Sequence, residues 1–218
     1  MASSADVRGV LFDLDGTLAD TQELILRSFR HTMSAVLGRE VPDAALMRKV
    51  GQPLAVQMWD FTDDAAVHEE LLRVYRDYNA RIHDRYIKRF PGTRATLERL
   101  SAAGFALGVV TSKRRAPALA ALRSCGIDDL LPVVVGSDDW PAHKPDPGPV
   151  VRGAELLGLP AAACAYVGDS PFDLQAGRGA GCFTVAALWG MFAPDVLAAE
   201  GPDAQCASIS EVGDLLGT

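Results

Sequence analysis

The chain has 218 residues, of which 49% are hydrophobic and 22% charged, a composition typical of a globular protein with a full hydrophobic core. Its net charge of −7 argues against a nucleic-acid partner, and no basic amphipathic segment or long apolar run indicates a membrane partner. The four cysteines form no C-x-x-C pair, which predicts reduced thiols, and residues 1–6 lack the pattern of a secretion signal. We therefore expect a cytoplasmic protein.

An apolar run at residues 7–12 predicts the first strand of a parallel sheet, and the string Asp-Leu-Asp-Gly-Thr follows it at positions 13–17. The apolar residues that come next recur at helical spacing, in short helices and then in a long charged helix over residues 65–85. Strand signals are nearly absent from this stretch. The pattern predicts an all-helical insertion after the first strand, over residues 18–89.

Strands and helices alternate from residue 93 onward, and most of the predicted helices end at a glycine. The predicted strands are 105–110, 133–135, 164–167 and 182–187, with a short edge strand at 207–209, and the predicted helices between them are 94–103, 117–125, 149–157 and 172–180. Such alternation predicts right-handed crossovers and an α/β fold with a doubly wound, Rossmann-like parallel sheet. We expect this core to comprise residues 1–17 and 90–218.

Polar residues stand at the carboxyl ends of four of these strands. They are Asp13 and Asp15 after the first strand, Thr111, Ser112 and Lys113 after the second, Lys144 in the loop after the third, and Asp169 and Asp173 after the fourth. Because the carboxyl ends of parallel strands lie along one edge of a sheet, these side chains can converge. Taken alone, each has an ordinary explanation as a helix cap, a turn residue or a solvated side chain. Their joint placement predicts a site.

The chemistry of this set indicates phosphoryl transfer. Four converging carboxylates would repel one another unless cations compensate them, and Mg²⁺ prefers oxygen ligands. Lys144 would add a permanent positive charge, and Thr111 and Ser112, with amides at a helix N-terminus, could hold phosphate oxygens. A metal, a lysine, hydroxyl and amide donors and a carboxylate positioned for attack make up the inventory of a phosphoryl-transfer site.

These motifs resemble those of the haloacid dehalogenase superfamily of phosphatases. The matching residues are the string at 13–17, then Thr111, then Lys144, then Gly-Asp-Ser-x-x-Asp at 168–173, in order over essentially the whole chain. The helical insertion is similar to the small helical cap of that superfamily. Within the insertion, Val-Gly-Gln-Pro-Leu at 50–54 and Tyr-Arg-Asp-Tyr-Asn at 75–79 resemble the bacterial pyrophosphatase and phosphoglycolate phosphatase branch.

The resemblance implies a role for each matching residue. Asp13 would be the nucleophile that forms an aspartyl-phosphate, and Asp15 would protonate the leaving oxygen and then activate water. Thr111 would bind the phosphoryl group, and Lys144 would offset negative charge. Mg²⁺ would be held by Asp13, the backbone carbonyl of Asp15 and Asp169, with Asp173 acting through water or from behind the ligands.

Further candidates for substrate binding lie next to these residues. Gly16 and Thr17 would shape the nucleophile loop, Ser112 and Lys113 neighbour the phosphate site, and Gln52 lies in a cap loop that could face the cleft. The presence of Asp15 favours phosphate esters or anhydrides, because the dehalogenases of the superfamily release a halide ion without a proton and lack this second acid.

Other positions in the insertion carry weaker signals. Arg48 and Lys49 lie beside Gln52 and could face the cleft or end a helix in solvent. Trp59 and Tyr75 occur at helical spacing with other apolar residues, so we expect both to pack inside the insertion.

We therefore expect a Mg²⁺-dependent phosphohydrolase, monomeric or homodimeric, that acts on a small phosphorylated metabolite, with phosphoglycolate and pyrophosphate as the leading candidates. Two alternatives stay open. A sugar-phosphate mutase would share the core and differ in the cap. A receiver-like module would accept a phosphoryl group on aspartate without turnover, but such a domain is much shorter and lacks an acid equivalent to Asp15.

Overall fold

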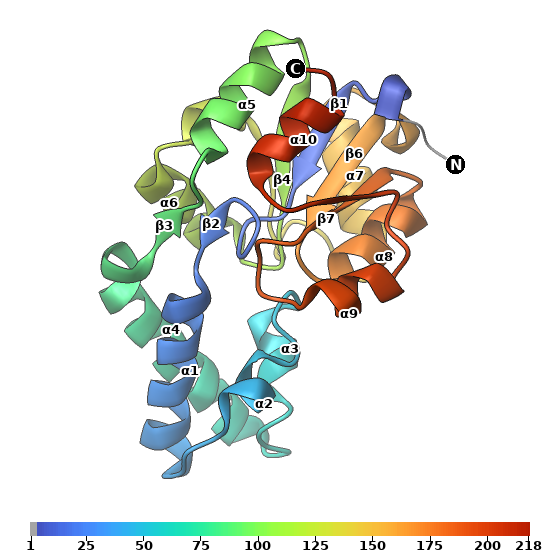
Figure 1. The fold of residues 1–218 in the computed structure, drawn as a ribbon. Coiled ribbons are helices and arrows are strands. Elements are labelled where there is room, and N and C mark those ends of the chain that lie inside the picture. Colours follow the sequence, from blue (N-terminus) through green and yellow to red (C-terminus); the bar gives the residue numbers. More distant parts are fainter. Residues whose placement is uncertain (1–3) are drawn as a thin grey trace.

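The computed structural model describes residues 4–218, and in it a six-stranded sheet with flanking helices stands above a smaller group of helices (Figure 1). The sheet order is β5-β4-β1-β6-β7-β8, and all neighbouring strands are parallel. The strands are β1 (Gly9–Phe12), β4 (Ala106–Val110), β5 (Val133–Val135), β6 (Cys164–Gly168), β7 (Phe183–Ala187) and β8 (Ala204–Cys206). The predicted doubly wound parallel sheet is confirmed.

The central strand β1 sets the position of the first motif. Phe12 pairs with Val109 of β4 and with Val167 of β6, so the residues that follow in all three strands emerge at the same edge of the sheet. Alternate residues of β1 face opposite sides, with Val10 and Phe12 in one apolar cluster and Leu11 in another. All four residues of β1 are buried, as expected for a strand covered on both faces.

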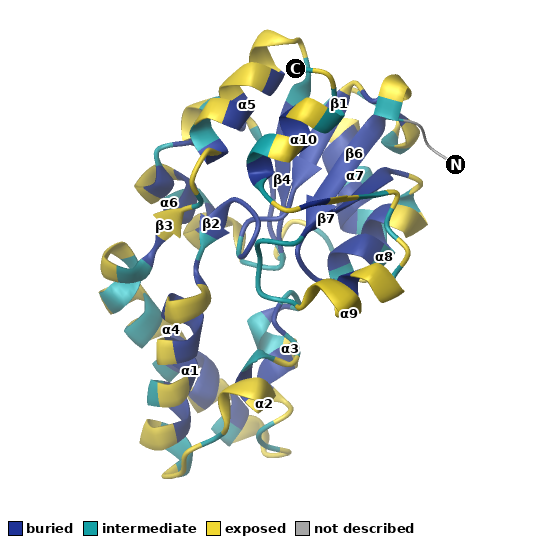
Figure 2. Cartoon of the chain, viewed as in Figure 1, coloured by how far each residue is buried: buried dark blue, intermediate teal, exposed yellow. Residues whose placement is uncertain are grey.

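Helices cover both faces of the sheet, and Figure 2 shows buried strands between helices whose outer faces are exposed. One face packs against α5 (Thr93–Ala102), α6 (Arg115–Cys125) and α10 (Ile209–Leu215), and the other against α7 (Gly148–Leu156) and α8 (Pro171–Ala180). The remaining elements of the core are α9 (Pro194–Ala199) and the short 3₁₀ helices η1 (Ser4–Asp6), η2 (Asp128–Leu130) and η3 (Ala161–Ala163).

The predicted edge strand at 207–209 is wrong. The edge strand is β8, which ends at Cys206, and Ile209 already begins α10. The reason lies in the preceding turn, where the Asp203 carboxylate accepts hydrogen bonds from the backbone N–H and the hydroxyl of Thr184 in β7. This contact fixes the register of Ala204–Cys206 against β7, and the apolar Ile209 packs into the core from the helix instead.

The insertion is helical, as predicted, and its helices bury apolar residues against one another. They are α1 (Gln22–Leu37), α2 (Asp43–Met47), α3 (Leu54–Met58) and α4 (Ala65–Tyr86). Phe29 of α1 lies at the centre of this cluster and meets the ring of Tyr75 of α4 edge-on, with ring centroids 5.0 Å apart. We call α1 to α4 the cap and the part built on the six-stranded sheet the core.

Two short strands join the cap to the core, and the sequence did not predict them. β2 (Ala19–Asp20) and β3 (Lys88–Arg89) pair antiparallel, so the two chain crossings between core and cap run side by side (Figure 1). Strands of two residues are too short to leave a periodic pattern in the sequence. The domain borders at 17/18 and 89/90 stay predictions.

Trp59 does not pack inside the cap, contrary to expectation. It is 46% exposed, and its ring stacks on that of His68 with centroids 3.8 Å apart. Tyr75 is buried, as predicted. The difference arises because Trp59 follows the end of α3 instead of lying on the inward face of a helix.

All four cysteines are free and buried, in agreement with the reduced thiols expected from the sequence. Among the described helices, none has the combination of length and apolar character that a membrane crossing requires.

Candidate active site

Asp13 is the first residue after β1, and its side chain is buried. Its backbone N–H donates to the carbonyl of Val167 at 2.9 Å, so the residue continues the ladder between β1 and β6. The Lys144 ammonium lies 2.8 Å from Asp13 Oδ1 and 2.5 Å from Asp173 Oδ1. The structure thus brings together three residues that are 29 to 160 positions apart in the chain.

The loop after Asp13 is a tight turn that brings Gly16 and Thr17 against Asp169. The Leu14 carbonyl accepts hydrogen bonds from the N–H groups of three residues, Thr17, Leu18 and Ala19. Gly16 has φ +86°, and a Cβ there would lie only 2.2 Å from Asp169 Oδ2, so both the turn and the close approach require glycine. The Thr17 hydroxyl donates to Asp169 Oδ1 at 3.1 Å. The residues at 16 and 17 therefore shape the loop that follows Asp13, and their predicted part in substrate binding stays a prediction.

Asp169 is held from the opposite side by the segment after β7. The backbone N–H of Met191 donates to Asp169 Oδ2 at 2.7 Å, and the Trp189 indole N–H donates to the Thr17 carbonyl at 2.9 Å. Between them, Gly190 allows the chain to pass the Asp169 side chain, since a Cβ at this position would lie 2.1 Å from that of Asp169. No motif in the sequence marks this segment.

Both carboxylate oxygens of Asp173 are already engaged by protein donors. Oδ1 accepts from Lys144 at 2.5 Å and from the Tyr166 hydroxyl at 3.2 Å, and Oδ2 accepts from the backbone N–H and the hydroxyl of Ser170 at 3.0 and 2.5 Å. Asp173 also forms a capping box with Ser170 at the start of α8. This arrangement suits a residue that positions Lys144 better than it suits a direct metal ligand. Sequence reasoning missed Tyr166, whose hydroxyl is also bonded to the Val110 carbonyl.

The charges of the cluster are unbalanced. Burial raises the pKa of Asp13 to about 7, with Lys144 opposing the shift and Asp173 adding to it. Burial, with the neighbouring carboxylates, also raises the pKa of Asp169 well above its usual value. Burial disfavours the charge on Lys144, but Asp13 and Asp173 outweigh it and raise the lysine pKa. One ammonium thus faces three buried carboxylates, a set that favours binding of a further cation.

The available oxygens fit a hard divalent cation. Asp13, Asp169 and Asp173 each offer a carboxylate oxygen, and these atoms lie within 4.8 Å of one another. Within residues 4–218, neither Asp13 Oδ2 nor the backbone carbonyl of Asp15 accepts a hydrogen bond. Both atoms could therefore ligate Mg²⁺ together with Asp169, and Mg²⁺ commonly takes one or two carboxylates and keeps several waters.

A cavity of about 780 Å³ opens from this edge of the sheet toward the cap. Its wall includes Asp13, Asp15 and Thr111 from the core, and Gln52, Tyr75 and Arg76 from the cap. The Thr111 backbone N–H donates to the Val135 carbonyl at 2.9 Å, which fixes the residue at the end of β4. The two predicted catalytic acids, Asp13 and Asp15, thus line a cavity whose wall comes from both the core and the cap.

The residues after Thr111 also lie on this wall. The Lys113 ammonium is 2.8 Å from Asp15 Oδ1, and the Ser112 hydroxyl donates to the Gly51 carbonyl of the cap at 2.6 Å. Ser112 therefore connects core and cap, while Lys113 pairs with the second acid.

The two basic residues beside Gln52 do not reach the cavity. Arg48 and Lys49 both pair with Asp60, at 2.8 and 2.5 Å, and neither is on the cavity wall. The expectation that they could face the cleft is wrong, because Asp60 at the end of α3 holds them at the cap surface. Gln52 itself does line the cavity.

Comparison with known proteins agrees with this geometry. Residues 10–187 match the model of the haloacid dehalogenase-like hydrolase family. The chain is 40% identical over 197 residues to a PpaX protein of Caldanaerobacter subterraneus subsp. tengcongensis, a match that covers 90% of this chain and 89% of the relative. It is 32% identical to pyrophosphatase PpaX of Bacillus velezensis, with 97% of each chain covered.

Solved structures share the whole fold. The crystal structure of a predicted phosphoglycolate phosphatase from Haemophilus somnus 129PT superposes with a TM-score of 0.89 at 24% identity, covering 96% of this chain and 98% of that one. The family resemblance drawn from the four motifs is confirmed. The chain belongs to the haloacid dehalogenase-like hydrolases.

Proposed function

We propose that this chain is a Mg²⁺-dependent phosphatase that acts on a small phosphorylated metabolite through a phosphorylated Asp13. The observation that carries the proposal is the position of Asp13, which is held by Lys144 at 2.8 Å, stands beside Asp169 and opens onto the cavity next to Asp15. A buried carboxylate with an adjacent lysine and a second acid on the same wall supports attack on phosphorus better than a structural role.

In the first step, an oxygen of Asp13 attacks the phosphorus atom and the bond to the leaving oxygen breaks. Asp15 gives its proton to that oxygen, so the leaving group departs as a neutral hydroxyl or as the protonated anion. In the second step, water attacks the phosphorus atom of the aspartyl-phosphate and gives a proton to Asp15. The bond between phosphorus and Asp13 then breaks, which releases inorganic phosphate and restores both acids.

The other residues would hold charge and geometry during these steps. Lys144 offsets negative charge on Asp13 and on the phosphoryl group, and Asp173, fixed by Ser170 and Tyr166, keeps the lysine in place. Thr111 would donate to a phosphoryl oxygen. Asp13, Asp169 and the Asp15 carbonyl would hold Mg²⁺, which when bound supplies positive charge beside the phosphoryl oxygens.

Phosphoglycolate and pyrophosphate remain the leading substrates. Their support is the curated relatives named pyrophosphatase PpaX and a structural neighbour described as a predicted phosphoglycolate phosphatase. The cap, which carries Gln52 and Arg76 to the cavity, would select between them.

The test is release of inorganic phosphate from a panel of small phosphates, measured with Mg²⁺ and with a chelator. The panel contains phosphoglycolate, pyrophosphate, a sugar phosphate and an aryl phosphate. We expect turnover with Mg²⁺ and its loss with the chelator. Burst labelling without turnover would indicate a receiver-like module, and an isomerised sugar phosphate without free phosphate would indicate a mutase.

A further inference from the structure

Lys113 is the second cation of the site, and its surroundings differ from those of Lys144. Its side chain is 16% exposed, lies on the cavity wall, and has Asp15 as its one partner within residues 4–218, at 2.8 Å. Lys144 is 2% exposed and is bound by two buried carboxylates. Lys113 can therefore exchange partners at the cavity surface, whereas Lys144 is fixed.

The position of Lys113 relates it to the leaving group. If Asp15 donates to the leaving oxygen, that oxygen lies within hydrogen-bond distance of the Asp15 carboxyl group. The Lys113 ammonium contacts Asp15 Oδ1, so it lies beside the first few atoms of the leaving group. When Asp15 turns to the leaving oxygen, the ammonium loses its partner unless the substrate supplies another anion.

We propose that Lys113 is a specificity-determining residue whose ammonium binds an anionic group on the leaving group in exchange for Asp15. The enzyme then prefers phosphates whose leaving group carries a second negative charge a few atoms from the scissile oxygen, such as a carboxylate or a further phosphoryl group. This inference rests on the proposed phosphatase function, in which Asp15 faces the leaving group.

Other cationic side chains on the cavity wall could account for a preference for an anionic leaving group. Arg76 of α4 is exposed on this wall and has no ion-pair partner in the described part of the chain. Arg114 also lines the cavity but is paired with Asp138. Arg76 could therefore bind the same anion from the cap, and the experiment has to distinguish it from Lys113.

The experiment compares 2-phosphoglycolate with the analogue in which its carboxylate is replaced by an uncharged carboxamide. The two substrates differ in the charge of the leaving group and share the same phosphate. For each enzyme variant we measure kcat and KM for both and take the ratio of the two kcat/KM values. In Lys113→Met the ratio should fall by roughly 10- to 100-fold, mainly through a higher KM for phosphoglycolate, because a hydrogen bond between charged groups is lost. Lys113→Arg should restore most of the preference.

Lys88→Met is the matched control. Lys88 lies in β3, is exposed, and is not on the cavity wall, so this variant removes the same charge and should keep both the ratio and the activity. Lys113→Gln serves as a second variant if Lys113→Met does not fold, as judged by circular dichroism and thermal unfolding.

The outcomes separate this inference from the function on which it rests. If the unaltered protein releases phosphate from no member of the panel described above with Mg²⁺, the proposed function fails and the inference fails with it. If it hydrolyses the sugar or aryl phosphate but neither phosphoglycolate nor pyrophosphate, only the inference is overturned. If the unaltered protein hydrolyses both phosphoglycolate and its amide, and Lys113→Met leaves the ratio of their kcat/KM values unchanged, only the inference is overturned. An equal fall in kcat/KM for both substrates leaves the ratio unchanged and counts in the same way. The same holds if Arg76→Met lowers the ratio and Lys113→Met does not.

Discussion

Two regions border the cavity: the edge of the core that carries Asp13, Lys144 and Asp173, which we call the core edge, and the cap. Their charged side chains differ in how far they are buried. At the core edge, Asp13, Lys144 and Asp173 are buried, and the lysine pairs with the two carboxylates at 2.8 and 2.5 Å. Several ion pairs of the cap lie in solvent instead, and Arg73, for example, is 60% exposed in its pairs with Glu70 and Asp77. Buried pairs depend strongly on both partners, whereas exposed pairs contribute little to stability.

This difference in burial suggests a different role for each of the two regions. The core edge holds a fixed set of charges that suits one kind of chemistry. The cap adds Arg76 to the cavity wall, and under the proposed function this side chain would meet the leaving group. The cap is joined to the core by the paired strands β2 and β3 and by contacts such as that of Ser112 with Gly51. We expect changes at the core edge to abolish the reaction and changes at the border with the cap to alter its substrate range.

The largest effect should come from Asp13→Asn. An amide cannot attack phosphorus, so phosphate release should fall by at least about 10⁴-fold. The fold should be retained, because Lys144 keeps its pair with Asp173 and one buried negative charge is removed. Phosphate release and circular dichroism measure the two quantities. Activity near that of the unaltered protein would exclude Asp13 as the nucleophile.

Asp15→Asn should have the next largest effect. Loss of a positioned acid and base costs roughly 10²–10⁴-fold in rate. The loss in the first step should be greater for an alkyl phosphate, whose leaving group needs a proton, than for p-nitrophenyl phosphate, whose leaving group does not. Steady-state rates with both substrates test this. A loss below about threefold on the alkyl phosphate would contradict the role of Asp15.

The balance of charge at the core edge also predicts how Mg²⁺ and pH act on stability. The folded pKa of Asp13 is about 7, above its ordinary value of 3.8, so between these pH values the folded state binds more protons than the unfolded state. The stability of the metal-free protein should therefore fall as pH rises through this window. Because Mg²⁺ needs deprotonated ligands, its stabilisation should be larger at pH 8 than at pH 5.

Thermal unfolding with Mg²⁺ and with EDTA, from pH 5 to pH 8, measures this difference. With Mg²⁺ well above its Kd we expect a gain in Tm of about 5–10 °C at pH 8 and a much smaller gain at pH 5. Asp13→Asn is the control, and it should flatten the dependence on pH. An equal gain at both pH values would mean that the cation binds away from Asp13 and Asp169.

Much of the core edge could be predicted from the sequence because its signals are local. Apolar runs end at polar residues, and parallel strands bring their carboxyl ends together, so Asp13, Lys144 and Asp169 could be expected to meet. The helical nature of the insertion also follows from local spacing. Neither feature requires knowing which side chain from another element lies next to a given residue.

The parts that could not be predicted depend on side-chain contacts between residues of different elements. Arg48 is drawn to the cap surface by Asp60, and Tyr166 reaches Asp173 across the turn between β6 and α8. Neither contact leaves a periodic pattern or a motif. The contacts of Met191 could not be predicted either. This residue follows β7, its backbone N–H donates to Asp169, and its side chain packs against the cap.

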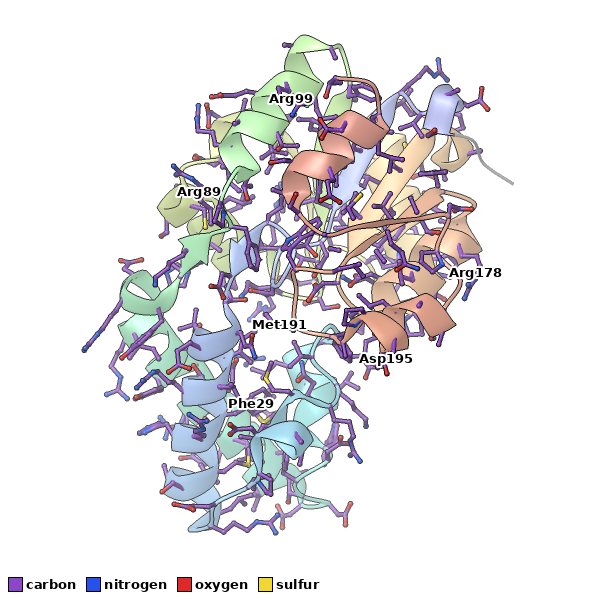
Figure 3. All side chains as sticks on the ribbon, viewed as in Figure 1. Phe29, Arg89, Arg99, Arg178, Met191 and Asp195 are labelled. Carbon is purple, nitrogen blue, oxygen red and sulfur yellow. The ribbon has the colours of Figure 1, made fainter. Side chains whose placement is uncertain are left out.

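Met191 tests the division between core and cap with the smallest expected effect. Its backbone N–H holds Asp169, while its side chain packs against the apolar cluster of the cap that contains Phe29 (Figure 3). Met191→Ala keeps the N–H and removes the side chain, so the Mg²⁺ concentration for half-maximal activity should stay the same. Loss of partly buried packing should lower Tm by about 2–4 °C, and KM should rise about threefold as the cap loses a contact. Met191→Leu, of similar volume, should match the unaltered protein. A tenfold shift in the Mg²⁺ requirement of Met191→Ala would show instead that cap packing controls the metal site, because only the side chain was changed.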